Sequence, residues 1–375
     1  MDSKYIKFLT LSLMLVLCTG CATNPVTGER EFSVVSDAQA RQIGEAQYRE
    51  GQQTQGGVYY LDPQLNTYVA EVGQKLAAVS DVPNLNYEFV VLNNPVPNAW
   101  ALPGGKIAVN RGLLTQLDNE AQLAAVLGHE IVHAAAGHGA SQMSRSVLIS
   151  LGVSLAGAVA SNTDYGDLVR SGSKLGAATW MASYGREDEL EADEYGMLYI
   201  SRAGYDPQGA VELQRTFVRL SEGRNPGFAE GLFASHPPSQ QRVDANMRIA
   251  SELPSGQTGR QAFLQATQQL RRDQEAYEAH EQAIAALQNN DPRSSLDYIE
   301  DAIALQPREG QFWELRGDAY RLLNNSSQAE TNYSRAIEEN PNYYRHWAAR
   351  GALRESLGRI EAAEQDYQRA RDLLN

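Results

Sequence analysis

Three residues at a fixed spacing are the part of this 375-residue chain best suited to do chemistry. His129 and His133 lie four positions apart in a segment with helical spacing, so their side chains project from one face of a helix. One zinc ion can bind both rings at that spacing. Glu130 lies between them, where its carboxylate can reach a water molecule on the zinc and act as general base. We therefore expect one Zn²⁺ per chain and a hydrolytic reaction.

A chance match to this pattern on an exposed helix is the alternative. The neighbouring positions are apolar, among them Leu127, Ile131 and Val132, so we expect the histidines to be buried. Buried polar side chains need partners, and a metal ion provides them.

The third zinc ligand must come from outside this motif. The chain's two cysteines, Cys18 and Cys21, both lie near its start, so the folded body has no cysteine ligand and no disulfide. One zinc-binding pattern would need glycine at position 136 and histidine at 139, where the chain has Ala136 and Gly139. His138 is off that register by one, so we expect it to be structural or to orient a ligand.

An acidic segment at residues 183–196 offers candidates for that ligand. Glu189 and Asp193 lie at i and i+4, so one can bind zinc while the other accepts a ring N–H from a ligand histidine. Glu187 and Glu191 have the same spacing. Geometry alone does not choose between the two pairs, and a solvated acidic face accounts for some of these carboxylates.

The elements that must position these residues are mostly helices. The motif helix is expected to begin near Asn119 and to end at Gly137. Spacing predicts two more helices and two strands, over residues 37–48, 65–79, 87–92 and 106–109. The fold class is therefore α+β, mostly α, with a small β-sheet.

A turn at residues 103–105 precedes the second of these strands, which we expect to be an edge strand over the motif helix. An extended substrate could add to it through main-chain hydrogen bonds. The alternative is an ordinary structural strand. The residues predicted to bind substrate in this way are Gly105, Lys106, Ile107, Ala108 and Val109.

His236 stands in a Ser-His-Pro-Pro loop that could carry it to the metal. It could stabilise the oxyanion of the tetrahedral intermediate, or it could take the open zinc position and keep the enzyme latent. A plain surface histidine is the remaining alternative. For Arg242, on the next helix, we expect a structural ion pair, with an active-site role as the alternative.

The N-terminus has the layout of a secretory signal. A basic start and a ten-residue apolar run precede Cys21, which resembles the lipidated cysteine of bacterial lipoproteins. A plain cleaved signal and a Cys-x-x-Cys redox pair are weaker alternatives. Ala22 follows the cysteine, which by resemblance to lipoprotein sorting signals implies the outer membrane of a Gram-negative cell. A second apolar stretch, residues 147–160, is too short to span a bilayer and is expected to be a buried helix, with membrane contact as the alternative.

The last hundred residues repeat with a period of 34 residues, which is typical of tetratricopeptide repeats. The positions that recur are Trp313, Gly317, Ala329, Tyr333 and Ala336, followed by Trp347, Gly351, Ala363, Tyr367 and Ala370. We expect an α-solenoid of about three repeats, the first degenerate. Such arrays usually bind a peptide or protein on their concave face, and some only brace a neighbouring domain.

The composition excludes several classes of protein. With 42% apolar and 21% charged residues, disorder, collagen and a polytopic membrane protein are disfavoured. Acidic residues exceed basic ones by 46 to 32, giving a net charge of −14. We therefore expect no nucleic-acid partner.

Four motifs in this order, at residues 98–105, 129–133, 189–193 and 204–207, resemble the HtpX-like zinc metallopeptidases related to CAAX prenyl proteases. The resemblance covers about residues 35–250 and implies a zincin fold of the gluzincin type. The family's Glu-x-x-x-Asp falls on Glu189 and Asp193, which implies Glu189 as third zinc ligand and Asp193 as the group that orients a ligand histidine. Arg186 is displaced from the family's Ser-Arg, so the resemblance assigns it no role.

A secreted peptidase fused to tetratricopeptide repeats is similar to the periplasmic BepA-like branch, which acts in outer-membrane protein quality control. This implies a lipid-anchored zinc endopeptidase whose partners are unfolded or misassembled envelope proteins, with the outer-membrane assembly machinery as a further candidate. A largely latent peptidase that acts as a chaperone or adaptor is the alternative. Trimming of lipidated substrates is disfavoured, since the membrane helices of that branch are missing.

The expected organisation of the chain has five parts: a signal peptide at 1–20, a lipidated tether at 21–35, the peptidase at 36–250, a linker at 251–273 and the repeats at 274–375.

Overall fold

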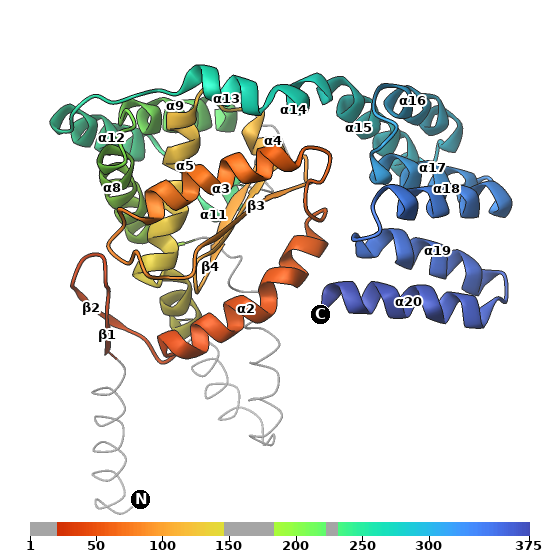
Figure 1. Ribbon diagram of the computed structural model, residues 1–375, viewed down its shortest axis with the longest axis horizontal. Coiled ribbons are helices and arrows are strands. Elements are labelled where there is room, and N and C mark those ends of the chain that lie inside the picture. The colour runs from red at the N-terminus through yellow and green to blue at the C-terminus, as the bar shows by residue number, and fades with distance from the viewer. Residues whose placement is uncertain (1–20, 146–183, 223–231) are drawn as a thin grey trace, which may run out of the picture.

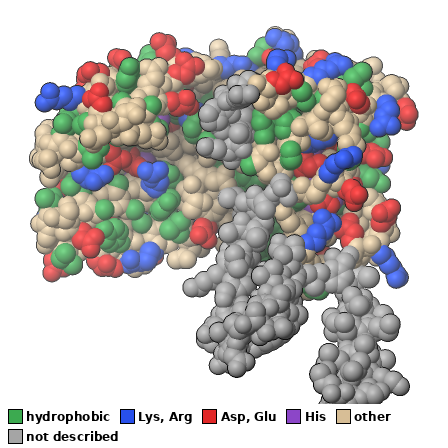
Figure 2. Space-filling model, turned by 180° about the vertical axis from the view of Figure 1, so that it is seen from behind, with side chains coloured by type: hydrophobic (Ala, Val, Ile, Leu, Met, Phe, Trp, Pro, Cys, Tyr) green, Lys and Arg blue, Asp and Glu red, His purple; other side chains and the backbone are tan. Residues whose placement is uncertain are grey.

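A computed structural model describes residues 21–145, 184–222 and 232–375 of the chain (Figure 1). The predicted signal peptide and the apolar stretch at 147–160 lie outside these residues. Among the helices described, none is both long and apolar enough to cross a membrane. On the face drawn in Figure 2, acidic and basic side chains are interspersed among apolar ones over the described surface.

The chain folds into an N-terminal body, from β1 to α12, and a repeat array, from α15 to α20, joined by two short helices. The body contains β1 (Cys21–Thr23), β2 (Arg30–Phe32), α2 (Asp37–Thr54), α3 (Pro63–Ala77), β3 (Glu88–Leu92), β4 (Ala99–Leu102), β5 (Lys106–Asn110), α4 (Arg111–Leu114), α5 (Glu120–Ala136), α8 (Arg186–Arg202), α9 (Gln208–Glu222), α11 (Leu232–Ser235) and α12 (Gln240–Glu252). The predicted mostly helical α+β class is confirmed.

A three-stranded sheet in the order β3-β5-β4 forms one wall of the body. β5 pairs in parallel with β3 and antiparallel with β4. Side chains of β5 alternate between two faces, as strand geometry requires. Ile107 and Val109 pack into the main core with α3 and α5, while Lys106 and Ala108 face α2.

The position of β5 corrects one prediction. Residues 106–109 form a strand as expected, but it is the central strand of the sheet and not an edge strand. Both sides of β5 are already hydrogen-bonded, so no substrate strand can add to it. Lys106 is buried and pairs with Glu45 and Glu88.

α5 is the buried helix at the centre of the body. Its N-cap residue, Asn119, accepts a hydrogen bond from the Gln122 amide at 2.9 Å. Gly137 ends the helix in a left-handed conformation with φ of 76°, which glycine adopts without strain. Both predicted ends of this helix are therefore confirmed.

Two glycines let α8 approach α5 closely. A Cβ on Gly128 would lie 3.1 Å from the Gly196 carbonyl oxygen, and a Cβ on Gly196 would lie 3.1 Å from the His129 amide. Since neither glycine carries a side chain, the two backbones nearly touch. This close crossing brings the acidic face of α8 against the histidines of α5.

The predicted linker is folded onto the body. It contains α13 (Arg260–Ala266) and α14 (Gln268–Arg272), whose Phe263 and Leu270 are buried in the main core. Thr258 also accepts a backbone hydrogen bond from Ala121 at the start of α5.

The repeat array consists of three helix pairs, as predicted. They are α15 (Gln274–Gln288) with α16 (Pro292–Leu305), α17 (Gly310–Leu322) with α18 (Ser326–Glu339), and α19 (Tyr344–Ser356) with α20 (Ile360–Leu374). Gly317 packs against the Tyr333 ring and Gly351 against the Tyr367 ring, each so closely that a Cβ would clash or crowd the ring. The recurring glycines and tyrosines therefore set the approach of the two helices in each pair.

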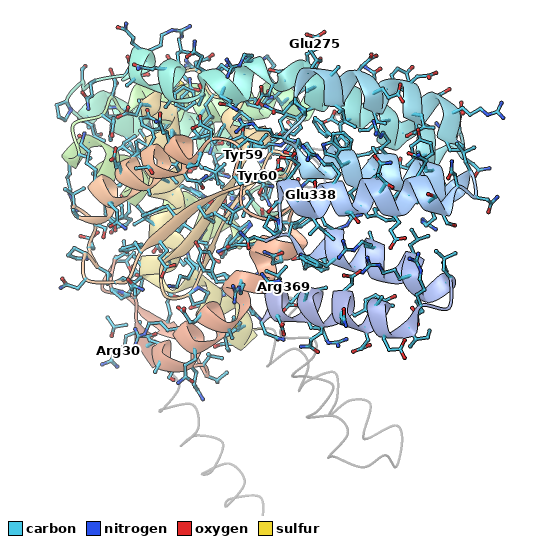
Figure 3. The ribbon with its side chains drawn as sticks, turned by 45° about the vertical axis from the view of Figure 1, so that its right-hand side comes forward. Arg30, Tyr59, Tyr60, Glu275, Glu338 and Arg369 are labelled. Atoms are coloured by element: carbon cyan, nitrogen blue, oxygen red, sulfur yellow. The ribbon has the colours of Figure 1, made fainter. Side chains whose placement is uncertain are left out.

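The array docks onto the body partly through hydrogen bonds of Tyr60. The Tyr60 hydroxyl donates to the Arg308 carbonyl at 2.6 Å and accepts from the Gly310 amide at 2.8 Å. Tyr59 and Tyr60 lie at this junction (Figure 3). At the other end of the array, α20 lies beside α2 (Figure 1).

Residues 21–35, expected to be a tether, are instead packed on the body in part. β1 and β2 pair as an antiparallel hairpin. Asn24, in its turn, is 2% exposed and hydrogen-bonds to Glu191 on α8. The backbone amides of Val34 and Val35 donate to the Ser144 hydroxyl.

Candidate metal centre and active site

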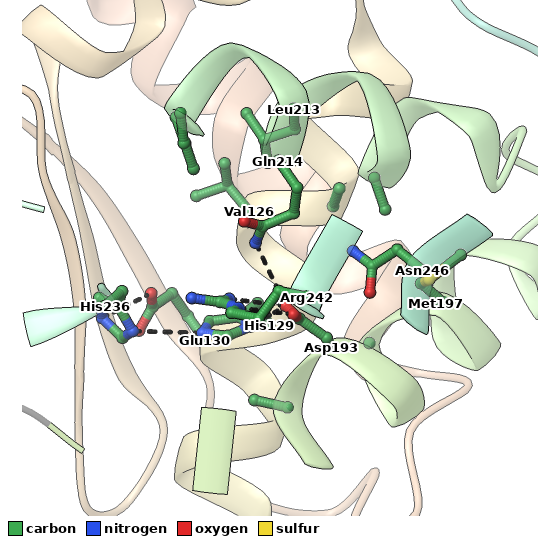
Figure 4. A pocket seen from close by; sticks show the side chains of 15 residues that line it. Val126, His129, Glu130, Asp193, Met197, Leu213, Gln214, His236, Arg242 and Asn246 are labelled. Carbon is green, nitrogen blue, oxygen red and sulfur yellow. Dashed lines mark hydrogen bonds and ion pairs between the residues drawn. The ribbon is translucent and has the colours of Figure 1, made fainter. Parts of the chain in front are cut away.

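Four buried side chains from three places in the chain bring their donor atoms together. Figure 4 shows two of them, His129 and His236. His129 and His133 come from α5, Glu189 from α8 and His236 from the loop after α11. The Nε2 atoms of the two α5 histidines are 3.0 Å apart. Glu189 carboxylate oxygens lie 3.5 Å from His129 Nε2 and 3.3 Å from His133 Nε2. His236 Nδ1 lies 2.8 Å from Glu189 Oε1 and 3.2 Å from His129 Nε2.

These separations fit a tetrahedral zinc site. Zinc binds histidine nitrogen and carboxylate oxygen at about 2.0–2.2 Å, which places tetrahedral ligands about 3.3 Å from one another. The observed donor separations, 2.8 to 3.5 Å, bracket that value. The donor set of three imidazoles and one carboxylate also suits zinc. The residues present therefore fit the metal.

Glu130 lies beside this cluster with both oxygens buried. Its Oε1 is 3.5 Å from His236 Nε2, and its Oε2 has no hydrogen-bond partner among the described residues. Burial raises the pKa of the Glu130 carboxyl above its ordinary value, although His236 and His129 act in the opposite direction. A carboxylate that is poorly solvated and lacks partners is a stronger base than one in water.

His129 is held by an acid–arginine pair. Its Nδ1 lies 3.0 Å from Asp193 Oδ1, and Arg242 binds both oxygens of Asp193 at 2.7 Å. Arg242 also reaches Glu189 Oε2 at 2.7 Å. Burial tends to raise the pKa of Asp193, but Arg242 and His129 lower it below its ordinary value. The expected ion pair of Arg242 is present, and it connects two members of the cluster.

His133 is enclosed by two side chains. The Tyr184 ring stacks on it with a centroid distance of 3.8 Å, and His138 Nδ1 lies 2.8 Å from His133 Nδ1. His138 follows the break at Gly137 and so faces back to α5, away from the donor cluster. Its other nitrogen lies 3.2 Å from Glu191.

The structure shows which of the two acidic pairs faces the histidines, a choice that residue spacing alone could not make. Glu189 and Asp193 both face the histidines, whereas Glu187 is exposed and Glu191 pairs with His138. His236 lies in the cluster and not on the surface. Gly105 and the β5 residues lie elsewhere, in the sheet.

Sequence reasoning missed Tyr184 and Asn24. Tyr184 follows no pattern that marks a site, and its hydroxyl lies 3.5 Å from the Ala101 carbonyl oxygen on β4. Asn24 sits in an Asn-Pro segment typical of a turn, and nothing in that pattern points to a partner on α8.

The cavity at this site is small. Its volume is about 30 Å³, and its lining includes His129, Glu130, Asp193 and His236 (Figure 4). That is room for about one water molecule. The described residues therefore bring the reactive groups together around a small cavity.

A helix bearing two histidines and a glutamate, a second helix supplying a carboxylate and a small sheet define a metallopeptidase fold. Residues 63–249 match the model of peptidase family M48, and residues 280–330 and 323–374 match that of the tetratricopeptide repeat. The chain belongs to peptidase family M48 and is a metalloprotease of that family with C-terminal tetratricopeptide repeats.

Three relatives are informative. The mitochondrial metalloendopeptidase OMA1 of Schizosaccharomyces pombe is 32% identical over 238 residues, which cover 63% of this chain and 68% of the relative. The beta-barrel assembly-enhancing protease of Escherichia coli K12 is 29% identical over 242 residues, covering 62% of this chain and 48% of the relative. The metalloprotease YcaL of the same organism is 28% identical over 260 residues, covering 65% and 96%.

This chain thus spans about half the length of the beta-barrel assembly-enhancing protease. Among solved structures, the first tetratricopeptide domain of Spaghetti (RPAP3) bound to an HSP90 peptide is 25% identical, with a TM-score of 0.26, and covers 27% of this chain and 80% of that one. The assignment of the repeats depends on the family model and not on this score.

Proposed function

We propose that the chain is a zinc endopeptidase whose zinc is held by His129, His133 and Glu189, with His236 as a fourth, removable ligand. The observation that carries the proposal is the convergence of these donors beside Glu130 in a chain of family M48. When bound, zinc supplies a Lewis acid for the scissile carbonyl and for the attacking water.

Glu130 takes a proton from the attacking water and passes it to the leaving amine. Its burial supports this role, because a raised pKa brings a carboxyl closer to the pH at which it must both accept and return a proton. Asp193 accepts the Nδ1–H of His129 and so keeps Nε2 free for the metal. Arg242 holds Asp193 in place.

His236 keeps the enzyme latent. Its Nδ1 takes a place in the donor cluster, and its Nε2 lies 3.5 Å from Glu130 Oε1. A zinc site with four protein ligands has no position left for water. Movement of the loop between α11 and α12 would free that position and Glu130 together. The small cavity supports a closed resting state.

The substrate would bind along β4 in place of β5, on the side of β4 that pairs with no described strand. The Asn98 carbonyl accepts from the Asn110 amide, so alternation along the antiparallel pair directs the main chain of Trp100 and Leu102 toward β5. The main-chain groups of Ala99 and Ala101 therefore point to the other side. The Tyr184 hydroxyl already lies 3.5 Å from the Ala101 carbonyl oxygen. An extended peptide would replace that contact and bond to the main chain with little sequence preference.

The cellular role we propose is that of a lipoprotein of a Gram-negative outer membrane, anchored through Cys21 and facing the periplasm. Its substrates would be unfolded or stalled envelope proteins, recruited or positioned by the repeats at 274–375 for the peptidase at 36–250. The relative named beta-barrel assembly-enhancing protease supports this reading. The outer-membrane assembly machinery is the partner we would test first.

A second function is a chaperone or assembly adaptor whose peptidase stays latent. The small cavity favours it, since about 30 Å³ at the donor cluster does not hold a peptide. The complete donor set and Glu130 favour the peptidase.

The test compares four forms of the full-length chain in mild detergent: the parent, Glu130→Gln, His236→Ala, and the double variant. Zinc content and cleavage of an unfolded protein are measured in each. We expect one zinc per parent chain, cleavage by His236→Ala, and none by either form with Glu130→Gln. Zinc without cleavage by any form would favour the adaptor, and no zinc in the parent would overturn the proposal.

A further inference from the structure

A line of polar side chains, buried except for the half-buried Glu191, leads from His133 to the N-terminal hairpin. His133 Nδ1 lies 2.8 Å from His138 Nδ1, and His138 Nε2 lies 3.2 Å from Glu191 Oε1. The Asn24 amide donates to the same Glu191 oxygen at 2.8 Å. His133, His138 and Asn24 are each no more than 2% exposed. Side chains from α5, the residues after it, α8 and the hairpin thus form one connected series.

The chemistry of His133 fixes the direction of every hydrogen bond in this series. Its Nε2 belongs to the donor cluster, so its Nδ1 must carry the proton. His138 Nδ1 must then accept, which places the His138 proton on Nε2. That Nε2–H donates to Glu191, which as a carboxylate accepts from both His138 and Asn24. Each atom in the series can therefore act as the hydrogen-bond donor or acceptor that its position requires.

We propose that His138, Glu191 and Asn24 form a relay that positions His133 as a metal ligand, so that the N-terminal hairpin is part of the metal site. The relay rests on the proposed function, because it needs His133 to bind zinc. It is the counterpart of the Asp193–Arg242 pair that holds His129. The two α5 histidines are thus oriented by separate parts of the chain.

The hairpin turn fixes the amide of Asn24. Its Oδ1 accepts from the backbone amides of Val26 at 2.9 Å and Thr27 at 3.3 Å, so its NH₂ group must point away from the turn. That NH₂ donates to Glu191 and, at 2.7 Å, to Glu31. An amide in the reverse orientation would lose all four hydrogen bonds.

The same arrangement argues against a second metal site here. Glu31, His138 and Glu191 have the right atoms within reach of one another. However, the Asn24 NH₂ group already lies between the two carboxylates, and the Ser141 hydroxyl donates to Glu31 at 2.7 Å. Hydrogen-bond donors therefore satisfy these oxygens, and they act as part of the relay.

The experiment measures zinc affinity, and not only cleavage. The full-length chain is stripped of metal and titrated with zinc against a chelating dye, and the rate of zinc release is followed separately. His138→Phe keeps a ring but removes both hydrogen bonds, and we expect about 10-fold to 100-fold weaker binding, the range for residues that orient a ligand. His138→Gln can still accept and donate, so we expect it to retain most of the affinity.

Asn24→Ala tests whether the hairpin acts through the relay. We expect several-fold weaker zinc binding in the parent background and no further change in the His138→Phe background, because the relay is already broken there. Glu194→Ala, on an exposed position of α8, is the matched control and should bind zinc as the parent does.

The outcomes distinguish the relay from the proposed function. A parent that binds zinc while His138→Phe and Asn24→Ala bind it equally well would overturn the relay alone. Equal losses of affinity for Asn24→Ala in both backgrounds would also overturn it, since the hairpin would then act by another route. A parent that does not bind zinc would overturn both proposals.

Discussion

At the scale of the residue, Glu189 holds a position that a carboxylate alone can fill. It is 2% exposed and contacts three imidazoles and the Arg242 guanidinium. Burial would raise the pKa of Glu189, but His236 and His129 hold it well below its ordinary value. The side chain is therefore ionised where a metal needs an anionic ligand, and its charge also balances Arg242.

We predict that Glu189→Gln loses zinc and that Glu187→Gln does not. The amide keeps the shape of Glu189 but removes the charge, so zinc affinity should fall by more than the roughly 100-fold seen for a supporting residue. Glu187 lies two positions earlier on the same helix and is exposed, which makes it a matched control. Metal content after dialysis against a weak chelator measures both. The reverse result would move the ligand to the other acidic pair.

Sequence spacing placed the two histidines together, because a helix puts i and i+4 on one face whatever surrounds it. Glu130, the proposed base, follows His129 directly in the same helix. Spacing did not separate Glu189 from Glu187, since that depends on which face of α8 the Gly128–Gly196 crossing turns toward α5. Asn24 could not be found at all. Its partner, Glu191, is 167 residues away, and the contact exists only after the hairpin docks.

At the scale of the element, the sheet shows what local pattern cannot supply. Residues 106–109 were predicted as a strand from their own composition, and that is confirmed. Their place within the sheet depends on strands at 88–92 and 99–102, so pairing on both sides could not be read from the segment itself. We therefore propose β4, and not β5, as the strand that binds substrate.

The loop between α11 and α12 is the element on which the proposed latency depends. Two prolines follow His236, and Arg242 Nη1 donates to the Pro237 carbonyl at 3.3 Å. The loop is therefore fixed to the same arginine that holds Asp193 and Glu189. Release of His236 would leave the contacts of Arg242 with Asp193 and Glu189 in place, so the remaining ligands would keep their arrangement.

We predict that His236→Ala raises cleavage and weakens zinc binding together. If the loop is closed 99% of the time, removing the latch raises cleavage by about 100-fold. Zinc affinity falls because a fourth ligand is lost. An oxyanion donor would behave differently, since its loss lowers kcat by roughly 10²–10³ and leaves zinc affinity unchanged. Gln241→Ala, an exposed residue at the start of α12, is the control.

At the scale of the whole molecule, the body and the repeat array share one core. A single cluster of buried apolar side chains runs from Tyr59 in the body through Phe263 in the joining helices to Phe312 in α17. The repeats were predicted from their 34-residue period, which reports contacts within the array. The docking contacts involve residues outside that period, so the sequence did not reveal a shared core.

A buried acid lies at this junction. Glu309 is fully buried and accepts hydrogen bonds at 2.8 Å from the Asn93 amide of the body and from the Tyr277 hydroxyl of α15. Arg111 lies 3.4 Å above the Tyr277 ring and donates to Asn93 at 2.8 Å. These groups depend on one another, because each would lose one of its buried hydrogen bonds if a neighbour in the group were removed.

We predict that Asn93→Ala and Glu309→Gln each lower the free energy of unfolding by about 1.5–3 kcal/mol, the usual range for a hydrogen bond to a charged group. The double variant should lose less than the sum, by about 1 kcal/mol or more, because the two residues share one contact. Urea unfolding of the full chain measures all three. Glu338→Gln, on an exposed position of α18, should change stability by no more than about 0.5 kcal/mol. Strictly additive losses would mean that body and array do not stabilise each other through this acid, and their docking would then depend on the shared apolar core and the Tyr60 contacts.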